Sequence, residues 1–123
     1  MDADATIHAY YDALRNGEEL HPYFTADDAL VKVGISERLV GYDAVSEGLR
    51  EQTRHTGDWT VRSRDLRVTE RERYAWFSDE VTMAWRNLET GTRYAFDARW
   101  SGSLEDRDGW VFVGMHVSAP HDL

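Results

Sequence analysis

The sequence contains no cysteine, two prolines and a single lysine, Lys32, among its 123 residues. Without cysteine the chain has no disulfide, thiol nucleophile or thiolate metal site, which excludes zinc ribbons and thiol redox motifs. It also lacks an uninterrupted apolar run of the roughly 20 residues that a membrane helix requires. The first residues do not have the basic and then apolar order of a signal peptide. These absences predict a cytoplasmic protein with no membrane contact.

Acidic residues outnumber basic residues by 23 to 14, which gives a formal net charge of -9. A surface of this sign repels phosphate backbones, so we expect no nucleic-acid partner. All basic residues except Lys32 are arginine. This acidic, arginine-rich composition resembles that of proteins from halophilic microbes, whereas a GC-rich genome would explain the arginine but not the acid excess.

The length and the 41% of hydrophobic residues predict one domain, residues 1–123, with enough apolar material for a packed core. No linker, internal repeat or low-complexity segment divides the chain. No glycine-rich phosphate loop, zinc-protease motif or set of histidines at metal-ligand spacing occurs, so we predict no cofactor and no metal.

Apolar spacing predicts three helical segments in the first half of the chain. Ile7, Tyr10, Tyr11 and Leu14 recur at helical spacing, with Gly17 placed to end that helix. A short second turn is expected at residues 20–24, because the proline there limits a longer helix. A third helix is expected at residues 42–53.

The second half of the chain predicts strands joined by short turns. A short strand at residues 31–35 is followed by four long ones at 59–69, 74–86, 92–103 and 110–118. The apolar alternation changes phase within the first long strand, which predicts a β-bulge near residues 63–65. The expected fold is α+β, with three N-terminal helices packed on a strongly curved, mainly antiparallel sheet.

One polar residue, His116, interrupts the otherwise apolar last strand. Centring the preceding turn between residues 106 and 107 places Asp97 opposite His116, with Arg99 two residues away on the same face. Asp97 or His116 would carry a proton and Arg99 would stabilise an anion, which makes these three the candidate catalytic residues. In the alternative interpretation, the same side chains and Glu80 form a satisfied ion-pair network.

The same register divides the other sheet residues between two faces. Candidate ligand contacts are Tyr10, Trp59, Trp76, Glu80, Trp110 and Phe112, although aromatic residues at such spacings belong to the core more often. The opposite, apolar face contains Val81, Met83, Trp85, Phe96, Trp100, Val113 and Met115.

Several segments together resemble the SnoaL-like proteins of the nuclear transport factor two-like superfamily. They are GYDAV at the start of the third helix, DLRV followed by YAWFSDE, DARWSG, and DGW leading to MHVSAP. The resemblance covers nearly the whole chain. It implies a cone-shaped α+β barrel with a pocket between sheet and helices, and a homodimer across the outer sheet face. We assign the apolar face to that dimer, because a monomer rarely exposes so large an apolar patch.

Enzymes of this superfamily, such as ketosteroid isomerase and scytalone dehydratase, use Asp, His, Tyr or Arg side chains in the pocket, but no complete catalytic set matches here. We therefore predict a non-catalytic, small-molecule-binding or association domain that forms homodimers. The alternative is an acid/base enzyme, an isomerase, dehydratase, hydrolase or cyclase, acting on a small organic substrate. Whether the protein is an enzyme stays open at this point.

Overall fold

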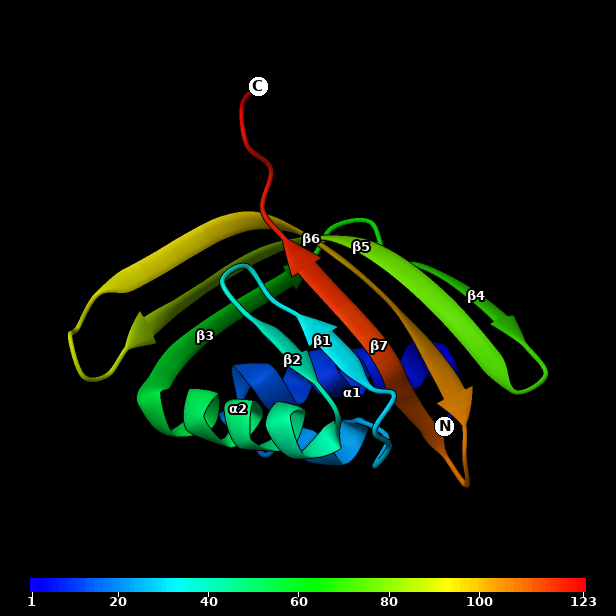
Figure 1. Ribbon diagram of the computed structural model, residues 1–123. Coiled ribbons are helices and arrows are strands. Elements are labelled where there is room, and N and C mark those ends of the chain that lie inside the picture. The colour runs from blue at the N-terminus through cyan, green and yellow to red at the C-terminus, as the bar shows by residue number, and fades with distance from the viewer.

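The computed structural model describes residues 1–123 and shows two helices beneath a curved seven-stranded sheet (Figure 1). The helices are α1 (Ala3–Arg15) and α2 (Tyr42–His55), with a 3-10 turn, η1 (His21–Tyr23), between them. The strands are β1 (Val31–Val33), β2 (Arg38–Val40), β3 (Thr56–Ser63), β4 (Arg67–Arg71), β5 (Tyr74–Asn87), β6 (Arg93–Asp106) and β7 (Trp110–Ser118). Neither helix is long and apolar enough to cross a membrane.

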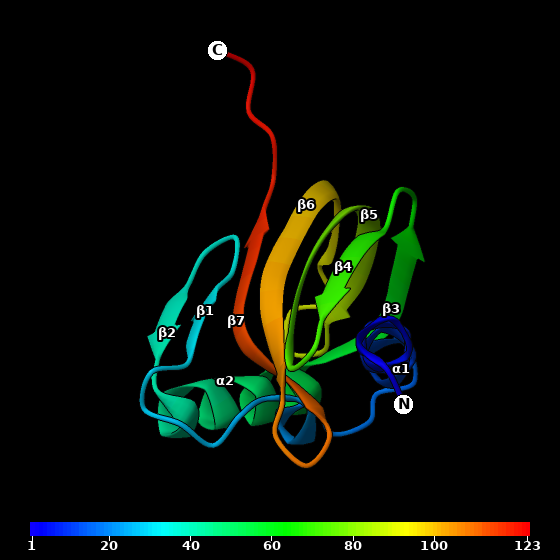
Figure 2. The same cartoon turned by 90° about the vertical axis from the view of Figure 1, so that its right-hand side faces the viewer.

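The sheet has the strand order β2-β1-β7-β6-β5-β3, and β4 pairs with the remaining part of β5. Every pairing is antiparallel except that of β1 with β7. The long strands β5 and β6 bend over the helices, so the sheet has a concave inner face and a convex outer face (Figures 1 and 2). The predicted α+β class with a curved, mainly antiparallel sheet is confirmed.

Helix α1 follows directly from its sequence signals. The Asp2 side chain caps the helix by accepting from the backbone N–H of Ala5, and Gly17 follows the last turn at a φ of 67°. Its predicted apolar side chains, including Ile7 and Tyr11, are fully buried against the sheet. Helix α2 buries Val45 and Leu49 in the same way.

The expectation of three helices is only partly met, because the middle segment forms the single 3-10 turn η1. Pro22 lies in its first turn, where the missing N–H is tolerated, and the turn ends at Phe24, whose backbone is extended with φ -109° and ψ 146°. Strand β2 was not predicted from the sequence. Its three residues have exposed or half-buried side chains and no clear alternation.

The predicted bulge near residues 63–65 corresponds to the break between β3 and β4. Ser63 pairs with Val81, whereas Arg67 pairs with Ser78, so the edge strands gain one residue relative to β5. The single strand expected at residues 59–69 is therefore two strands, and the phase change is confirmed. After the break, β4 pairs with the first part of β5 and lies near the start of α1, where the backbone N–H of Ala3 donates to Glu70 (Figure 2).

The apolar sheet face is the inner one, which the helices cover. Val81, Met83, Trp100 and Met115 are all buried within this one chain. Trp85, Phe96 and Val113, which belong to the same predicted interface, are half-buried. Our assignment of this face to a dimer interface is thus wrong, because α1 and α2 need an apolar surface for their own buried side chains.

Candidate functional site

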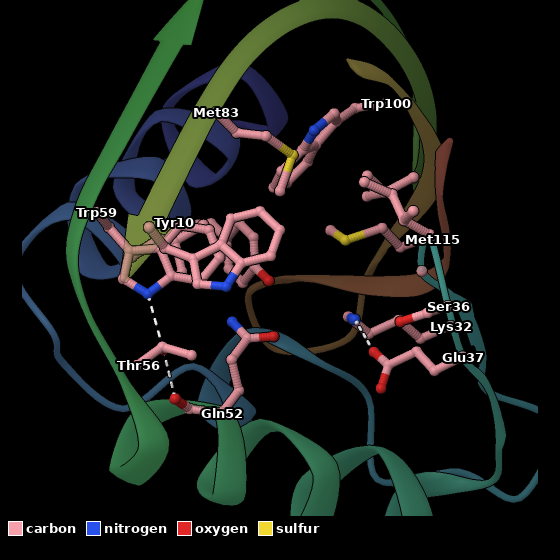
Figure 3. A pocket seen from close by; sticks show the side chains of 15 residues that line it. Tyr10, Lys32, Ser36, Glu37, Gln52, Thr56, Trp59, Met83, Trp100 and Met115 are labelled. Carbon is pink, nitrogen blue, oxygen red and sulfur yellow. Dashed lines mark hydrogen bonds and ion pairs between the residues drawn. The ribbon is translucent and has the colours of Figure 1, made fainter. Parts of the chain in front are cut away.

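A cavity of about 160 Å³ lies between the inner sheet face and the two helices. Its walls come from α1, the β1–β2 turn, the end of α2 and the inner side chains of β3, β5, β6 and β7 (Figure 3). The lining residues are Tyr10, Leu14, Lys32, Gly34, Ile35, Ser36, Glu37, Gln52, Thr56, Trp59, Met83, Trp85, Trp100, Met115 and Val117. Most of this surface is apolar, which is typical of small-molecule sites.

Stacked aromatic rings form one wall of the cavity. The rings of Trp59 and Trp85 lie 4.9 Å apart at an interplanar angle of 18°. Phe96 stacks on the far side of Trp85 with a centroid distance of 5.6 Å. The indole N–H of Trp59 donates to the hydroxyl of Thr56 at 2.9 Å, which fixes the orientation of the ring at the corner between α2 and β3. This wall presents a flat, rigid surface to a ring compound.

The opposite end of the cavity contains a partly buried ion pair. Lys32 points inward from β1 and is 6% exposed, and its Nζ lies 2.8 Å from Oε1 of Glu37. Glu37 follows the β1–β2 turn and folds back over Gly34. A Cβ atom at Gly34 would stand only 2.9 Å from the Glu37 Cγ, so glycine leaves the room that this return requires. The cavity therefore combines an aromatic wall with one internally neutralised pair of charges.

Three further polar groups lie in the otherwise apolar walls. The indole N–H of Trp100 has no hydrogen-bond partner although the residue is 3% exposed. Burial, and secondly the charge of Glu37, raise the pKa of Tyr10 far above its usual value, so its hydroxyl stays protonated in the physiological range. The amide of Gln52 points into the cavity from α2 (Figure 3). Tyr10 and Gln52 thus offer hydrogen-bond donors to a ligand, whereas the Trp100 N–H is buried within the wall.

The structure does not place Asp97 opposite His116. Ser101 pairs with His116, and Arg99 pairs with Ser118, so Asp97 lies beyond the end of β7. Asp97 instead accepts a hydrogen bond of 3.2 Å from Thr82 on β5. The predicted contact between Asp97 and His116 is wrong, because the turn before β7 contains three residues and a register shift follows at Ser103.

The polar residues do share one sheet face, as the register predicted, but it is the outer face. His116, Arg99 and Glu80 line a shallow polar depression there, and Arg99 Nε lies 3.9 Å from Glu80 Oε1. Arg64 joins this group through Glu80 and Asp97 at 3.8 and 4.0 Å. All these side chains are at least a third exposed, and such ion pairs contribute little. The arrangement matches the alternative ion-pair network for Glu80, Asp97 and Arg99, whereas His116 takes no part in these ion pairs.

Of the six predicted ligand contacts, Tyr10 and Trp59 line the cavity. Trp76 and Glu80 are exposed on the outer face, and Trp110 is half-buried against the core. Phe112 is fully buried but packs in the core between Tyr10 and Phe24, away from the cavity lining.

Sequence reasoning missed Lys32 and Glu37 as cavity residues. One signal was available, since Lys32 is the only lysine and occupies the middle of a predicted strand between two valines. The structure gathers no group of three or more His, Cys, Asp or Glu side chains that could hold a metal ion. The cavity lining contains a single carboxylate, that of Glu37.

A comparison with protein families gives one decisive result. The model of the SnoaL-like domain matches residues 3–122, nearly the entire chain. This chain belongs to the SnoaL-like domain family. No curated protein sequence matches this SnoaL-like domain.

Solved structures share the fold at low sequence identity. A candidate dehydratase of the NTF2-like family from Streptomyces avermitilis superposes with a TM-score of 0.83 at 15% identity, covering 97% of this chain and 94% of its own. A ketosteroid isomerase-like protein from Erwinia carotovora atroseptica gives 0.77 at 18% identity, with 97% and 94% covered. An NTF2-like superfamily protein from Salmonella enterica gives 0.82 at 14% identity, with 96% and 88% covered. These likenesses establish the fold of the SnoaL-like domain.

Proposed function

We propose that this SnoaL-like domain binds a small, neutral, mostly apolar ring compound in its inner cavity. The observation that carries the proposal is the cavity itself, with stacked Trp59 and Trp85 on one side and the Lys32–Glu37 pair on the other. Its volume of about 160 Å³ is close to that of engineered protein cavities that hold benzene, so a single ring is the expected size.

The ion pair favours a neutral ligand. Lys32 and Glu37 are 2.8 Å apart, so their charges largely cancel for a molecule in the cavity. An anion would meet the carboxylate of Glu37 and a cation would meet the ammonium of Lys32, and the largely apolar lining offers neither a compensating charge. A carbonyl or hydroxyl on the ring would accept from Tyr10 or Gln52, which supports a neutral ligand with one or two polar atoms.

Acid/base chemistry is the second candidate function, and the favouring observation is again the cavity pair. Glu37 and Lys32 are titratable groups that face the cavity within hydrogen-bond distance of one another. The earlier candidates Asp97, Arg99 and His116 do not support it, since they lie on the other side of the sheet. Binding is the more economical proposal, because both functions require it.

A pair of isosteric probes tests the proposal. We expect benzamide, which is neutral, to show saturable binding by ligand-observed NMR and calorimetry. Benzoate, which is anionic, should bind at least about tenfold more weakly, because desolvating a charge beside Glu37 is unfavourable. Equal affinities for both probes would contradict the neutral-ligand proposal.

Two tryptophan variants locate the binding site. Trp59→Ala removes part of the aromatic wall and should weaken benzamide binding about tenfold, the loss expected for an aromatic contact. The matched control Trp76→Ala removes an indole from the outer face and should leave the affinity unchanged. Circular dichroism verifies that both variants fold. Benzamide binding that is absent in the wild type, or lowered equally in both variants, would refute the cavity as the site.

A further inference from the structure

We propose that Lys32 forms a Schiff base with an aldehyde or ketone held in the cavity. The proposal rests on the proposed function, because the carbonyl compound must first occupy the same site. Three observations carry it: the location of a primary amine in the wall, a carboxylate within hydrogen-bond distance, and a lining suited to a carbonyl-bearing ring.

Lys32 is the only side-chain amine of the protein, and it is placed inside the cavity. Its side chain is 7% exposed, so a carbonyl compound reaches the amine only through the cavity. Each of the other basic residues is arginine, whose guanidinium stays protonated and does not form imines. An ion pair with Glu37 would be equally well made by arginine, whereas nucleophilic attack on a carbonyl requires the amine of lysine.

Glu37 is placed to move the protons that imine formation requires. Its Oε1 lies 2.8 Å from Lys32 Nζ, a hydrogen-bond distance at which a proton transfers directly. Its side chain is 39% exposed, so the carboxylate also exchanges protons with solvent. The close return of Glu37 over Gly34 holds the carboxylate at the mouth of the cavity, beside the amine (Figure 3).

The reaction balances without an oxidant or a metal. The ammonium of Lys32 gives one proton to Glu37, and the nitrogen lone pair then attacks the carbonyl carbon. A C–N bond forms while the carbonyl π electrons move to oxygen, which takes up the second proton of the amine through solvent or the Tyr10 hydroxyl. Glu37 then protonates the resulting hydroxyl, which leaves as water as the nitrogen lone pair forms the C=N bond. The products are a protonated imine, one water molecule and the regenerated carboxylate.

Reductive trapping tests the proposal. The protein of residues 1–123 is incubated with benzaldehyde and sodium cyanoborohydride near neutral pH, and benzylated peptides are quantified by mass spectrometry. We expect Lys32 to be labelled at least about tenfold faster than the N-terminal amine, because binding raises the local concentration of the aldehyde. Lys32→Arg should retain only the N-terminal label. Labelling of the N-terminal amine alone in the wild type would overturn the proposal.

Glu37→Gln separates a proton carrier from a simple ionic partner. If Glu37 moves protons, the labelling rate of Lys32 falls by about a hundredfold in this variant, the usual effect of losing a general acid or base. If Glu37 only pairs with the ammonium, its loss favours the uncharged amine in the buried site and the rate rises. A rate that is unchanged or higher would overturn the role of Glu37 in the proposal.

Benzamide competition separates failure of this proposal from failure of the proposed function, and it does not depend on how Glu37→Gln folds. Benzamide has no reactive carbonyl, so it should slow the labelling of Lys32 and leave the N-terminal amine unaffected. Benzamide that binds to a protein whose Lys32 is never trapped refutes the Schiff base and leaves the binding function intact. Lys32 trapping that benzamide does not slow refutes attack from within the cavity.

Discussion

The side chain of Asp79 shows how a single acidic residue is accommodated in the core. It lies between Phe77 and Val81 on the inner side of β5 and is 4% exposed. Its carboxylate accepts from the hydroxyl of Tyr11 at 2.9 Å and from the backbone N–H of Asp65 at 3.0 Å. These bonds link α1, β5 and the break between β3 and β4, so Asp79 is satisfied without a cationic partner.

The tyrosines beside the sheet predict a loss of stability at high pH. Burial, and then the charge of Asp79, raise the pKa of Tyr11 far above its usual value, and burial does the same for Tyr10. The unfolded chain therefore releases these protons near pH 10 while the folded chain retains them. The stabilisation from their protonated hydroxyls is fully present below pH 10. Above pH 10, each tyrosine should lower the free energy of unfolding by about 1.4 kcal/mol per pH unit.

Urea unfolding between pH 9 and 11 measures this effect. Tyr11→Phe should lower the free energy of unfolding at pH 8 by about 1 to 3 kcal/mol, because the carboxylate of Asp79 loses a donor. Above pH 10, the free energy of unfolding of this variant should decrease less steeply with pH than that of the wild type. Tyr74→Phe, at an exposed tyrosine, is the control. Parallel pH profiles for the wild type and Tyr11→Phe would contradict the assignment.

At the scale of the elements, short-range sequence signals predicted helix α1 well. Gly17 follows its last turn as expected, and the spacing of Ile7, Tyr10, Tyr11 and Leu14 gave its buried face. The register of β6 with β7 was not recoverable in the same way. Asp108 and Gly109 adopt positive φ in the connecting turn, and this geometry, with the later bulge, moves His116 opposite Ser101.

Gly102 is the point at which this bulge is most tightly packed. A Cβ atom there would lie 2.5 Å from the carbonyl oxygen of Gly114 and 2.9 Å from the ring of Phe77. Gly102→Ala should therefore lower the free energy of unfolding by about 1 to 3 kcal/mol, since neither the backbone nor a core ring moves easily.

Gly114→Ala is the matched control for that variant, because its nearest neighbour would be 3.8 Å away. We expect a change below about 0.5 kcal/mol for the control. Chemical denaturation of both variants measures the difference. Equal stabilities would show that the β6–β7 contact relaxes around an added methyl group.

At the scale of the molecule, the division of the sheet into one apolar and one polar face was predictable from alternation alone. Which face the helices cover was misassigned, although Ile7, Tyr11 and Leu49 on the helices require an apolar partner surface. The predicted site around His116 therefore lies on the outer face, whereas the cavity with Lys32 lies on the inner face. The cavity itself depends on strand curvature, which no short sequence pattern specifies.

A homodimer remains a prediction, and the outer sheet face is the part of the sheet that the helices leave free. Glu80, Arg99 and His116 give this face charges of both signs, which a two-fold contact can pair. Arg99→Glu should then dissociate the dimer in sedimentation equilibrium. Arg50→Glu on α2 makes the same charge change away from that face and should not. A monomeric wild type, or equal effects of both variants, would contradict this arrangement.

The halophilic origin suggested by the composition likewise stays a prediction.

The parallel pairing of β1 with β7 joins the first strand of the fold to the last. Lys32 lies beside Met115 in this pairing, so the wall that carries the amine is held by a strand more than 80 residues further along the chain. Contacts so distant in sequence form slowly, because the intervening chain must first close a long loop. During translation, the helices and the β1–β2 hairpin therefore emerge well before the strand that holds Lys32 in place, and the cavity is assembled only when β7 docks.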